Sequence, residues 1–411
     1  MTYKTILKLG VAAALTFAPV MSMAQGKTEL VIANSQWLDA LRGQRLWAAV
    51  ETYEASHPDV DLVQEAIPSN EFDNRIMTEM GAGQGPDIVI AQEGLFYTLA
   101  GADFLVPLDD VAKGAANLNA TNENGVIDGT RMGIAWQRAV YALIYNKALL
   151  EKAGATVPAD LDALIAQAGT VAATGAIGFT SRHSMNEFSG WFMDFQNWAY
   201  GYGVNWVDDA GHLTLDTPEA VAALTAFKQA YDAGIMPIGD PMSTQRTRFK
   251  EGQVGFSIDN SGGSLNIASG GAMPSADLGA APLPFAHPGA HQQIFLGLSK
   301  NSGNAEVAKD FLGWLISDEG QKAMRDASGP DALATDVPVT ADFAAANPWA
   351  TEFAELAKTS RSTLIPGHET ETGPIMRLVM EGVEKVLMGA ATPEEALAQA
   401  QTAAARKFDK S

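Results

Sequence analysis

The segment from Gly133 to Gly154, GIAWQRAVYALIYNKALLEKAG, constrains the fold more than any other stretch of this chain. Its first part alternates like a strand, and it turns helical at Asn146-Lys147 before ending at Gly154, where glycine accepts a left-handed backbone. The polar pair Gln137-Arg138 interrupts the apolar strand, and burying such a pair is costly unless it is paired or faces a gap. We therefore expect this strand to cross between two lobes, with its polar middle facing the gap.

The mature part of the chain alternates between strand and helix signals. Strands are expected at 29–33, 60–67 and 87–91, with a helix after each of the first two. The last of these strands is continuously apolar, as in a parallel sheet covered on both faces. This alternation predicts an α/β fold with a sheet flanked by helices in each lobe.

Composition excludes several function classes. The 411 residues carry a formal net charge of −21, which argues against nucleic acid or an anionic membrane surface as a partner, because both require a basic face. The chain has no cysteine, so disulfides, thiolate nucleophiles and cysteine-ligated metals are excluded. We expect neither a metal site nor a cofactor.

The N-terminus has the pattern of a secretory signal peptide. Lys4 and Lys8 precede an apolar run from Leu9 to Val20, and Ser22-Met23-Ala24 predicts cleavage after Ala24. The run is too short for a membrane anchor, which needs about 20 apolar residues. Since no cysteine follows the cleavage site, no lipid anchor is expected, and the sequence predicts a soluble periplasmic protein.

Five stretches resemble, in order, a known family. They are Gly85-Pro86-Asp87-Ile88-Val89, Leu143-Ile144-Tyr145-Asn146-Lys147, Phe295 to Ser299, Ala308 to Gly320 and Thr392 to Leu397. The series is similar to the extracellular solute-binding proteins of ABC importers, in particular the carbohydrate-binding group around maltose-binding protein. The resemblance implies the two-lobed type II periplasmic-binding-protein fold, a small carbohydrate ligand, ABC permease subunits as partners, a monomer and no catalytic residues.

The resemblance and the crossing strand together suggest domain boundaries. After the signal peptide at 1–24, the N-terminal lobe is expected to comprise 25–137 and 298–318. The C-terminal lobe is expected to comprise 138–297 and 319–411.

Candidate binding residues follow from the rule that ligands of parallel sheets lie beyond the carboxyl ends of strands. The loops at these ends are rich in amide, carboxylate, hydroxyl and indole groups, which suit a polyhydroxylated ligand. The candidates are Gln36, Trp37, Asn70, Glu71, Gln92, Glu93, Trp136, Gln137, Arg138, Arg182, His183, Trp191, Asn260, Ser261, Gly262 and His368.

Some candidates have a structural alternative. Asn70 and other small polar residues of these loops can simply cap helices, and Arg138 can form a salt bridge that steadies the hinge. Trp37 is expected in the gap rather than in the core. Arg182 and His183 are expected to be exposed.

The aromatic run from Trp191 to Trp206 also has two interpretations. Trp191, Phe195, Trp198 and Tyr202 fall at helical spacing, which favours core packing for most of them. Trp191 alone is kept as a stacking platform.

The ligand class stays open between two alternatives. By alignment with maltose-binding protein a stacking tryptophan is expected near Gly262 and another near Met376, and neither is present, which argues for a smaller or differently shaped ligand than a maltodextrin. An anionic sugar derivative or a glycerophosphate-type ligand is the alternative. It would be held by the amides of Gly262 and Gly263 together with one of the cationic side chains Arg138, Arg182, His183, His368 or Arg377.

An enzyme is the less favoured function class. The sequence contains no nucleophile elbow, zinc-protease motif or P-loop, although a glycosidase with a spatial carboxylate pair such as Glu71 and Glu93 remains the alternative.

Overall fold

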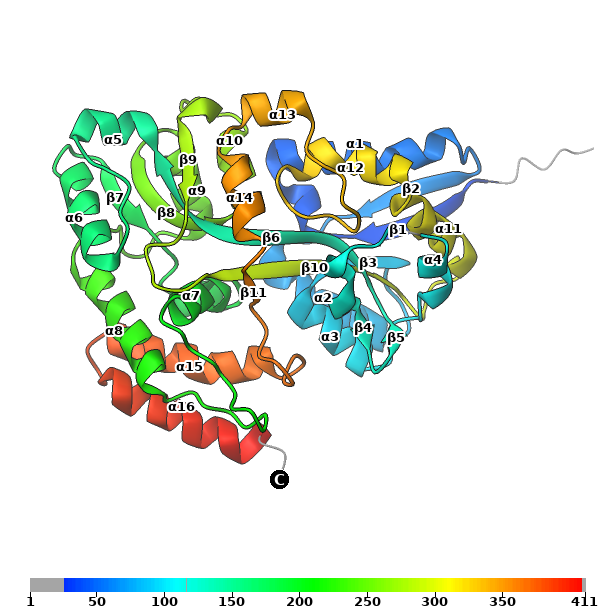
Figure 1. Ribbon diagram of the computed structural model, residues 1–411. Helices are drawn as coiled ribbons and strands as arrows, with labels where there is room; N and C mark the ends of the chain where they lie inside the picture. Colours follow the sequence, from blue (N-terminus) through cyan, green and yellow to red (C-terminus); the bar gives the residue numbers. More distant parts are fainter. Residues whose placement is uncertain (1–25, 116, 409–411) are drawn as a thin grey trace, which may run out of the picture.

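The computed structural model describes residues 26–115 and 117–408 and consists of two α/β lobes side by side (Figure 1). The predicted signal peptide, residues 1–24, lies outside the described part. Most strands belong to one extended sheet in the order β2-β1-β3-β10-β6-β8-β7, to which β9 and β11 add at β6 and β10. Within the described residues, no helix is both long and apolar enough to cross a bilayer.

Two long strands pass between the lobes, as the sequence predicts for the first of them. They are β6 (Ile134–Asn146) and β10 (Ala290–Leu298). The strand β6 has 13 residues, about twice the usual length, because its two halves serve two lobes. Its first half pairs with β10, and its second half, from Tyr141 onward, pairs with β8 and β9.

The end of this crossing segment follows the sequence closely. The helix α5 (Lys147–Ala153) starts after Asn146, whose side chain accepts a hydrogen bond from the backbone N–H of Leu149. Gly154 ends the helix with φ of 70°, in the left-handed region that residues with a Cβ atom rarely adopt. The predicted strand, helix and glycine cap are therefore confirmed.

The first lobe has parallel strands covered by helices on both faces (Figure 1). Its core on one face packs α1, α11 and α12, and its core on the other face packs α2 and α3. Its elements are β1 (Thr28–Ala33), α1 (Ala40–Glu51), β2 (Val60–Glu65), α2 (Ser69–Gly81), β3 (Ile88–Gln92), α3 (Glu93–Gly101), α4 (Asp109–Lys113), β4 (Val126–Ile127), β5 (Thr130–Arg131), α11 (Ala305–Leu315) and α12 (Asp318–Ser328).

The second lobe is also a sheet between two helical layers. Its larger core surrounds α7, α8, α15 and α16, and its smaller core joins α9, α10 and α14. Its elements are α5, α6 (Leu161–Ala172), β7 (Ile177–Thr180), α7 (Phe188–Gly201), α8 (Pro218–Asp232), α9 (Met242–Lys250), β8 (Val254–Asn260), α10 (Ser261–Ala268), β9 (Leu278–Ala281), α13 (Ala341–Ala346), α14 (Ala350–Leu356), β11 (Arg361–Ser362), α15 (Thr372–Leu387) and α16 (Pro393–Phe408).

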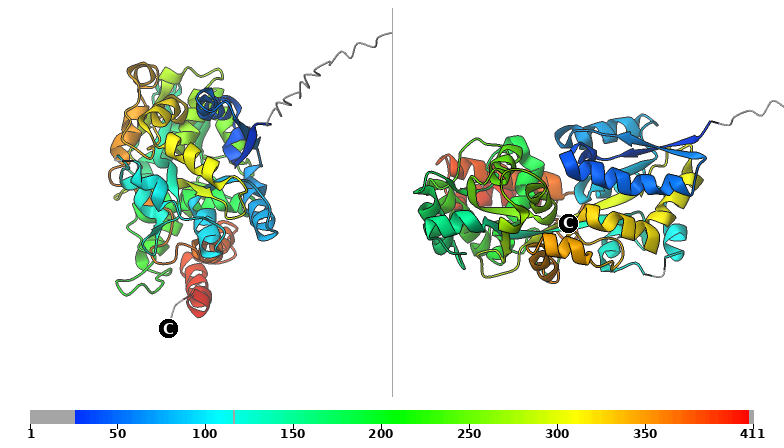
Figure 2. Two further views of the ribbon diagram at one scale, coloured as in Figure 1. Left: turned by 90° about the vertical axis from the view of Figure 1, so that its right-hand side faces the viewer. Right: turned by 90° about the horizontal axis from the view of Figure 1, so that it is seen from above.

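One predicted lobe boundary differs from the structure. The sequence places everything from residue 319 in the second lobe, yet Met324, Ala327, Leu333 and Ala334 pack in the core that contains α1 and α11. The helix α12 lies beside α1, as the view from above also shows (Figure 2). Because Ala334 still packs in the first lobe and Trp349 packs in the second, the chain crosses for the third time between these two residues. The sequence misses this because the amphipathic pattern of α12 does not show which lobe its apolar face contacts.

Candidate functional site

A hydrogen-bonded network of polar side chains lies where the two lobes meet. We call it the inter-lobe network, and it consists of Gln36, Arg42, Trp136, Gln137, Ser261 and Asp331. The indole N–H of Trp136 donates to Oε1 of Gln36 over 2.8 Å, and Nε2 of Gln36 donates to Oε1 of Gln137 over 3.0 Å. The same oxygen accepts from Nη2 of Arg42 over 3.0 Å. The first lobe thus binds the polar middle of β6.

The network continues into the second lobe through Asp331. This carboxylate accepts from Nη2 of Arg42 over 3.2 Å through one oxygen and from the hydroxyl of Ser261 through the other. Arg42 comes from α1 in the first lobe, while Ser261 begins α10 in the second. Asp331 follows α12, so the network joins both lobes and the crossing strand β6.

Two adjacent glycines in the first turn of α10 allow arginines to approach closely. A Cβ atom on Gly262 would lie 2.9 Å from Nη2 of Arg42, which belongs to the first lobe. A Cβ atom on Gly263 would lie 2.4 Å from Nη2 of Arg246 and from Oδ1 of Asp259, both in the second lobe. Asn260 caps the helix by accepting from the backbone N–H of Gly263 over 2.8 Å.

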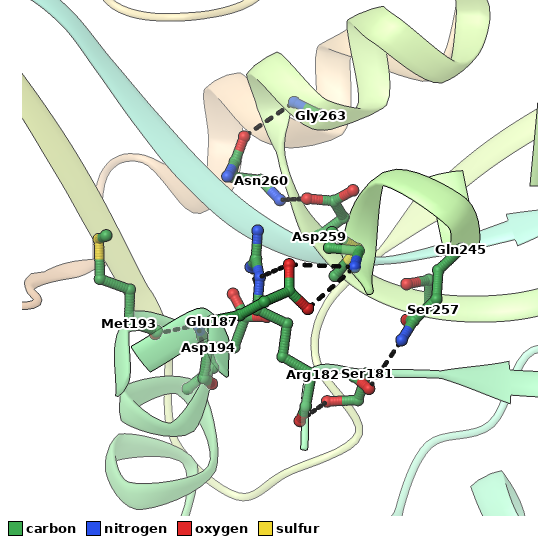
Figure 3. Close-up of polar contacts among 12 residues, drawn as sticks. Ser181, Arg182, Glu187, Met193, Asp194, Gln245, Ser257, Asp259, Asn260 and Gly263 are labelled. Carbon is green, nitrogen blue, oxygen red and sulfur yellow. Dashed lines mark hydrogen bonds and ion pairs between the residues drawn. The ribbon is translucent and has the colours of Figure 1, made fainter. Parts of the chain in front are cut away.

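Two ion pairs stand beside this helix start, within the second lobe. We call Arg182, Asp194, Arg246 and Asp259 the paired-charge cluster. Nη1 of Arg182 donates to Asp194 over 2.7 Å, and Arg246 binds both oxygens of Asp259 over 2.7 and 2.6 Å. Figure 3 shows Arg182 and Asp194 close to Asp259 and Asn260.

Burial controls the protonation of this cluster. Burial raises the pKa of Asp194 to about 6, and the neighbouring Arg182 opposes that rise. Burial also raises the pKa of Tyr141 well above its ordinary value, and Asp194 adds to the effect. Tyr141 is on β6, so the cluster borders the crossing strand.

A third polar contact involves Glu93 at the start of α3. Its carboxylate accepts hydrogen bonds from the hydroxyls of Ser362, over 3.1 Å, and Thr363 on the segment that leads into α15. Burial raises the pKa of Glu93 to about 7, while the two hydroxyls and Arg138 lower it. Arg138 itself donates to Oε1 of Gln293 on β10 over 3.2 Å.

The structure brings many of the predicted residues into these groups. Gln36, Trp136, Gln137 and Ser261 belong to the inter-lobe network, and Gly262 borders it. Glu93 and Arg138 face each other electrostatically. Asn260 and Arg182 lie at the paired-charge cluster.

Both tryptophans expected on the gap pack elsewhere, so these two placements are wrong. Trp37 lies in the first-lobe core, where its N–H donates to the carbonyl of Ile32 over 3.0 Å and its ring contacts Trp47 edge-on. Trp191 is fully buried in the second-lobe core. As expected from the helical spacing, Phe195 and Trp198 pack in the same core. Apolar partners supplied by distant segments decide these positions.

The two residues expected to be exposed are buried or paired. Arg182 is bound to Asp194, so it is not a free surface cation. His183 accepts from the backbone N–H of Gly239 over 2.7 Å and contacts the carbonyl of Ser181 over 2.9 Å with its other nitrogen. His183 therefore fastens the loop around Gly239.

Four further candidates are not placed in the groups described above. His368 is buried beside Gly211, 3.1 Å from its carbonyl oxygen. Glu71 and Gln92 are exposed on the first lobe, and the side chain of Asn70 lies outside the described part of the structure.

Two central residues of the network are not among the sequence candidates. Arg42 lies on α1, where it looks like an ordinary helix surface cation, and Asp331 lies outside the loops from which the candidates are taken. The only local signal is that Arg42 follows the candidate loop at 34–37 by little more than one helical turn. Within the described residues, no group of three or more acidic or histidine side chains is arranged to hold a metal ion.

Comparison with known proteins identifies relatives of this chain. A family model described as bacterial extracellular solute-binding protein matches residues 40–322. A binding protein of Brucella abortus is 27% identical over 323 aligned positions, and the alignment covers 74% of this chain and 76% of that protein.

Solved structures match the fold over nearly the whole chain. The GacH receptor of Streptomyces glaucescens, solved unliganded and with acarbose, has a TM-score of 0.82 at 21% identity and covers 93% of this chain and 100% of its own. Maltose-bound MalE3 of T. maritima has a TM-score of 0.80 at 22% identity and covers 92% of this chain and 98% of its own. A ribitol-bound solute-binding protein of Agrobacterium radiobacter has a TM-score of 0.78 at 18% identity and covers 93% of this chain and 99% of its own. These likenesses confirm the expected two-lobed α/β fold.

Proposed function

Because the chain belongs to the bacterial extracellular solute-binding protein family, we propose that it captures a neutral sugar or polyol between its lobes. We further propose that the mature protein is a periplasmic monomer, released by cleavage after Ala24, and that it delivers the solute to the permease of an ABC importer. The resemblance found in the sequence and the family match support the same role.

The observation that carries this proposal is the charge balance of the polar groups in and beside the region where the lobes meet. Arg42 is paired with Asp331, Arg182 with Asp194 and Arg246 with Asp259. A further arginine, Arg138, lies in the electrostatic field of Glu93. Three of these guanidinium groups are thus each bonded to a carboxylate, whereas a site for a phosphate or a sulfonate needs cationic donors in excess. A region rich in hydrogen-bonding groups without net positive charge suits hydroxyl groups.

Ligands of related structures support a neutral solute. The GacH receptor was solved with acarbose, MalE3 with maltose and the Agrobacterium protein with ribitol. Their sequence identity to this chain is too low to transfer any one ligand, but two of these, maltose and ribitol, are neutral polyhydroxylated molecules.

The proposed mechanism is hinge closure about β6, β10 and the third crossing segment. A solute that touches both lobes binds the closed state more tightly and shifts the equilibrium toward it. Exclusion of water then strengthens each hydrogen bond to the solute, because the local dielectric constant falls. The inter-lobe network is the region where such a solute contacts both lobes.

A thermal-shift panel tests the proposal, since a solute that binds only the folded protein raises its melting temperature. The panel contains maltose, D-tagatose, ribitol and further neutral sugars, together with glucose 6-phosphate and glycerol 3-phosphate. We expect a shift with at least one neutral compound and none with the phosphates. A shift with the phosphates alone would establish the anionic alternative instead.

We propose that the protein has no glycosidase activity. Of the two carboxylates considered for catalysis, Glu93 is buried and bonded to Ser362 and Thr363, while Glu71 is exposed. A compound that shifts the melting temperature is incubated with the protein and recovered by chromatography. Recovery of the unchanged compound is expected, and a cleaved product contradicts this part of the proposal.

A further inference from the structure

Two buried donors of the inter-lobe network have no hydrogen-bond partner among the described residues. They are Nε of Arg42 and Nε2 of Gln137, on side chains that are 8% and 0% exposed. The amide orientation of Gln137 is fixed, because its oxygen accepts from both Gln36 and Arg42. Leaving a buried donor unpaired costs about 1–3 kcal/mol, so a donor in this position is expected to meet an acceptor from outside the chain.

The two donors belong to neighbouring groups. Nη2 of Arg42 lies 3.0 Å from Oε1 of Gln137, so the guanidinium and the amide that carry the two unpaired N–H groups are in direct contact. Asp331, bonded to Arg42, also accepts from Ser261 of the second lobe. An acceptor bound to these donors therefore lies where the first lobe, the crossing strand and the second lobe meet.

The charge around Arg42 limits the kind of acceptor. Asp331 and Asp39 both contact its guanidinium, over 3.2 and 3.4 Å. An anion at this place would be repelled by two carboxylates. A hydroxyl or ring oxygen carries no net charge and would not be repelled in this way. A neutral oxygen is the matching partner.

Building on the proposed function, we infer that Arg42 and Gln137 are specificity-determining residues that donate Nε–H and Nε2–H to oxygen atoms of the bound sugar or polyol. Neither group serves only to tie the lobes together. This assigns to Arg42 a ligand contact that its position on a helix does not suggest, and it makes adjacent oxygens of the solute the recognised feature.

Isothermal titration of three variants tests the inference. Arg42→Lys keeps the charge next to Asp331 but removes the Nε–H donor, and Gln137→Met removes the amide at similar size. Arg45→Lys, on the exposed side of the same helix, is the matched control. With the best binder among maltose, D-tagatose and ribitol as the probe, we expect Kd to rise at least tenfold for the first two variants and to stay within twofold for the control.

Monodeoxy analogues of that probe separate a direct contact from a structural role. If Arg42 binds one hydroxyl, removing that hydroxyl weakens binding to the natural protein but not to Arg42→Lys, because the contact is already lost. Equal losses for every analogue in both proteins mean that water fills the place or that Arg42 acts only between the lobes, and they overturn the inference.

The remaining outcomes are also decisive. Unchanged Kd values for Arg42→Lys and Gln137→Met overturn the inference while the proposed function stands. If the natural protein binds no member of the thermal-shift panel, both fall together. Should Arg42→Lys fail to fold, the same comparison is made with Gln137→Met. The analogue that lacks the hydroxyl bound by Gln137 should then bind the natural protein more weakly but should not weaken binding to Gln137→Met further.

Discussion

The two groups of polar contacts at the start of α10 differ in what they connect. The inter-lobe network bonds Arg42 of the first lobe to Asp331 and, through it, to Ser261 of the second lobe. The paired-charge cluster bonds Arg246 to Asp259 and Arg182 to Asp194 inside the second lobe alone. In the proposed hinge motion, opening would break the bond between Asp331 and Ser261 of the first group and leave the second group intact.

This difference separates two tasks of buried charge. A buried ion pair within one lobe must be preserved at all times, because breaking it leaves a charge in a poor solvent. A bond that crosses the lobes can exchange its partner for water or a solute when the lobes part. The glycine pair Gly262-Gly263 lies on the boundary, with one residue facing each group. Variants in the two groups should therefore differ in kind as well as in size.

The largest effect is expected for Asp259→Asn in the paired-charge cluster. The change leaves Arg246 without its carboxylate, and breaking a buried pair costs about 3–5 kcal/mol. Urea unfolding measures the loss. Asp110→Asn, in an exposed pair with Lys309, is the control and should lose at most about 1 kcal/mol. Equal losses at the two sites would mean that the cluster is no more important than a surface pair.

The second effect concerns the pH dependence of stability at Glu93. Burial raises its pKa from 4.5 to about 7, so between these values the folded state binds a proton that the unfolded state releases. Stability is then fully present below pH 4.5 and falls as the pH rises through 7, by roughly 3 kcal/mol. Urea unfolding from pH 4.5 to 8 should show this slope in the natural protein.

Glu93→Gln isolates this contribution from other titrating groups. The variant keeps the hydrogen-bonding shape toward Ser362 and Thr363 but cannot ionise, so the difference in stability between the two proteins should change across the same pH range. Glu71→Gln, on an exposed side chain, should leave the slope unchanged. Parallel pH profiles for Glu93→Gln and the natural protein would contradict the raised pKa.

A smaller effect is expected for Asp331→Asn in the inter-lobe network. Arg42 and Ser261 lose a charged acceptor, but Arg42 keeps its contact with Asp39, so the expected cost is about 1.5–3 kcal/mol. The distinguishing result is a change of shape, because the lobes should part more readily. Small-angle scattering without any solute, at the same neutral pH for both proteins, should give a larger radius of gyration for Asp331→Asn than for Asp259→Asn. The same radius for both variants would contradict the assignment of Asp331 to the crossing contact.

The smallest effect is expected for alanine substitutions at Gly262 and Gly263. Gly263→Ala forces a Cβ atom against Arg246 and the buried Asp259, and overpacking of about 1–3 kcal/mol exceeds the helix gain of about 0.5–1 kcal/mol. Gly262→Ala meets the flexible end of Arg42, which can move away as the lobes part. We therefore expect a lower melting temperature for the first variant, and a larger scattering radius with an unchanged or higher melting temperature for the second.

The sequence by itself determined the crossing strand and its neighbourhood. The apolar alternation around Gln137, the switch to helix after Asn146 and the glycine at 154 are local signals, and each holds in the structure. The capping box from Thr392 to Glu395 is also present, with both reciprocal hydrogen bonds formed. Such features depend on contacts within a few residues, so a single sequence reveals them.

Tertiary structure alone decided which polar and aromatic side chains lie where the two lobes meet. Trp37 and Trp191 lie next to candidate loops, yet segments far along the chain bury them. Arg42 and Asp331 are separated by 289 positions and carry no shared motif, yet they form the central ion pair of the network. The direction of a side chain depends on the packing of distant elements, whereas local periodicity specifies only the element that carries it.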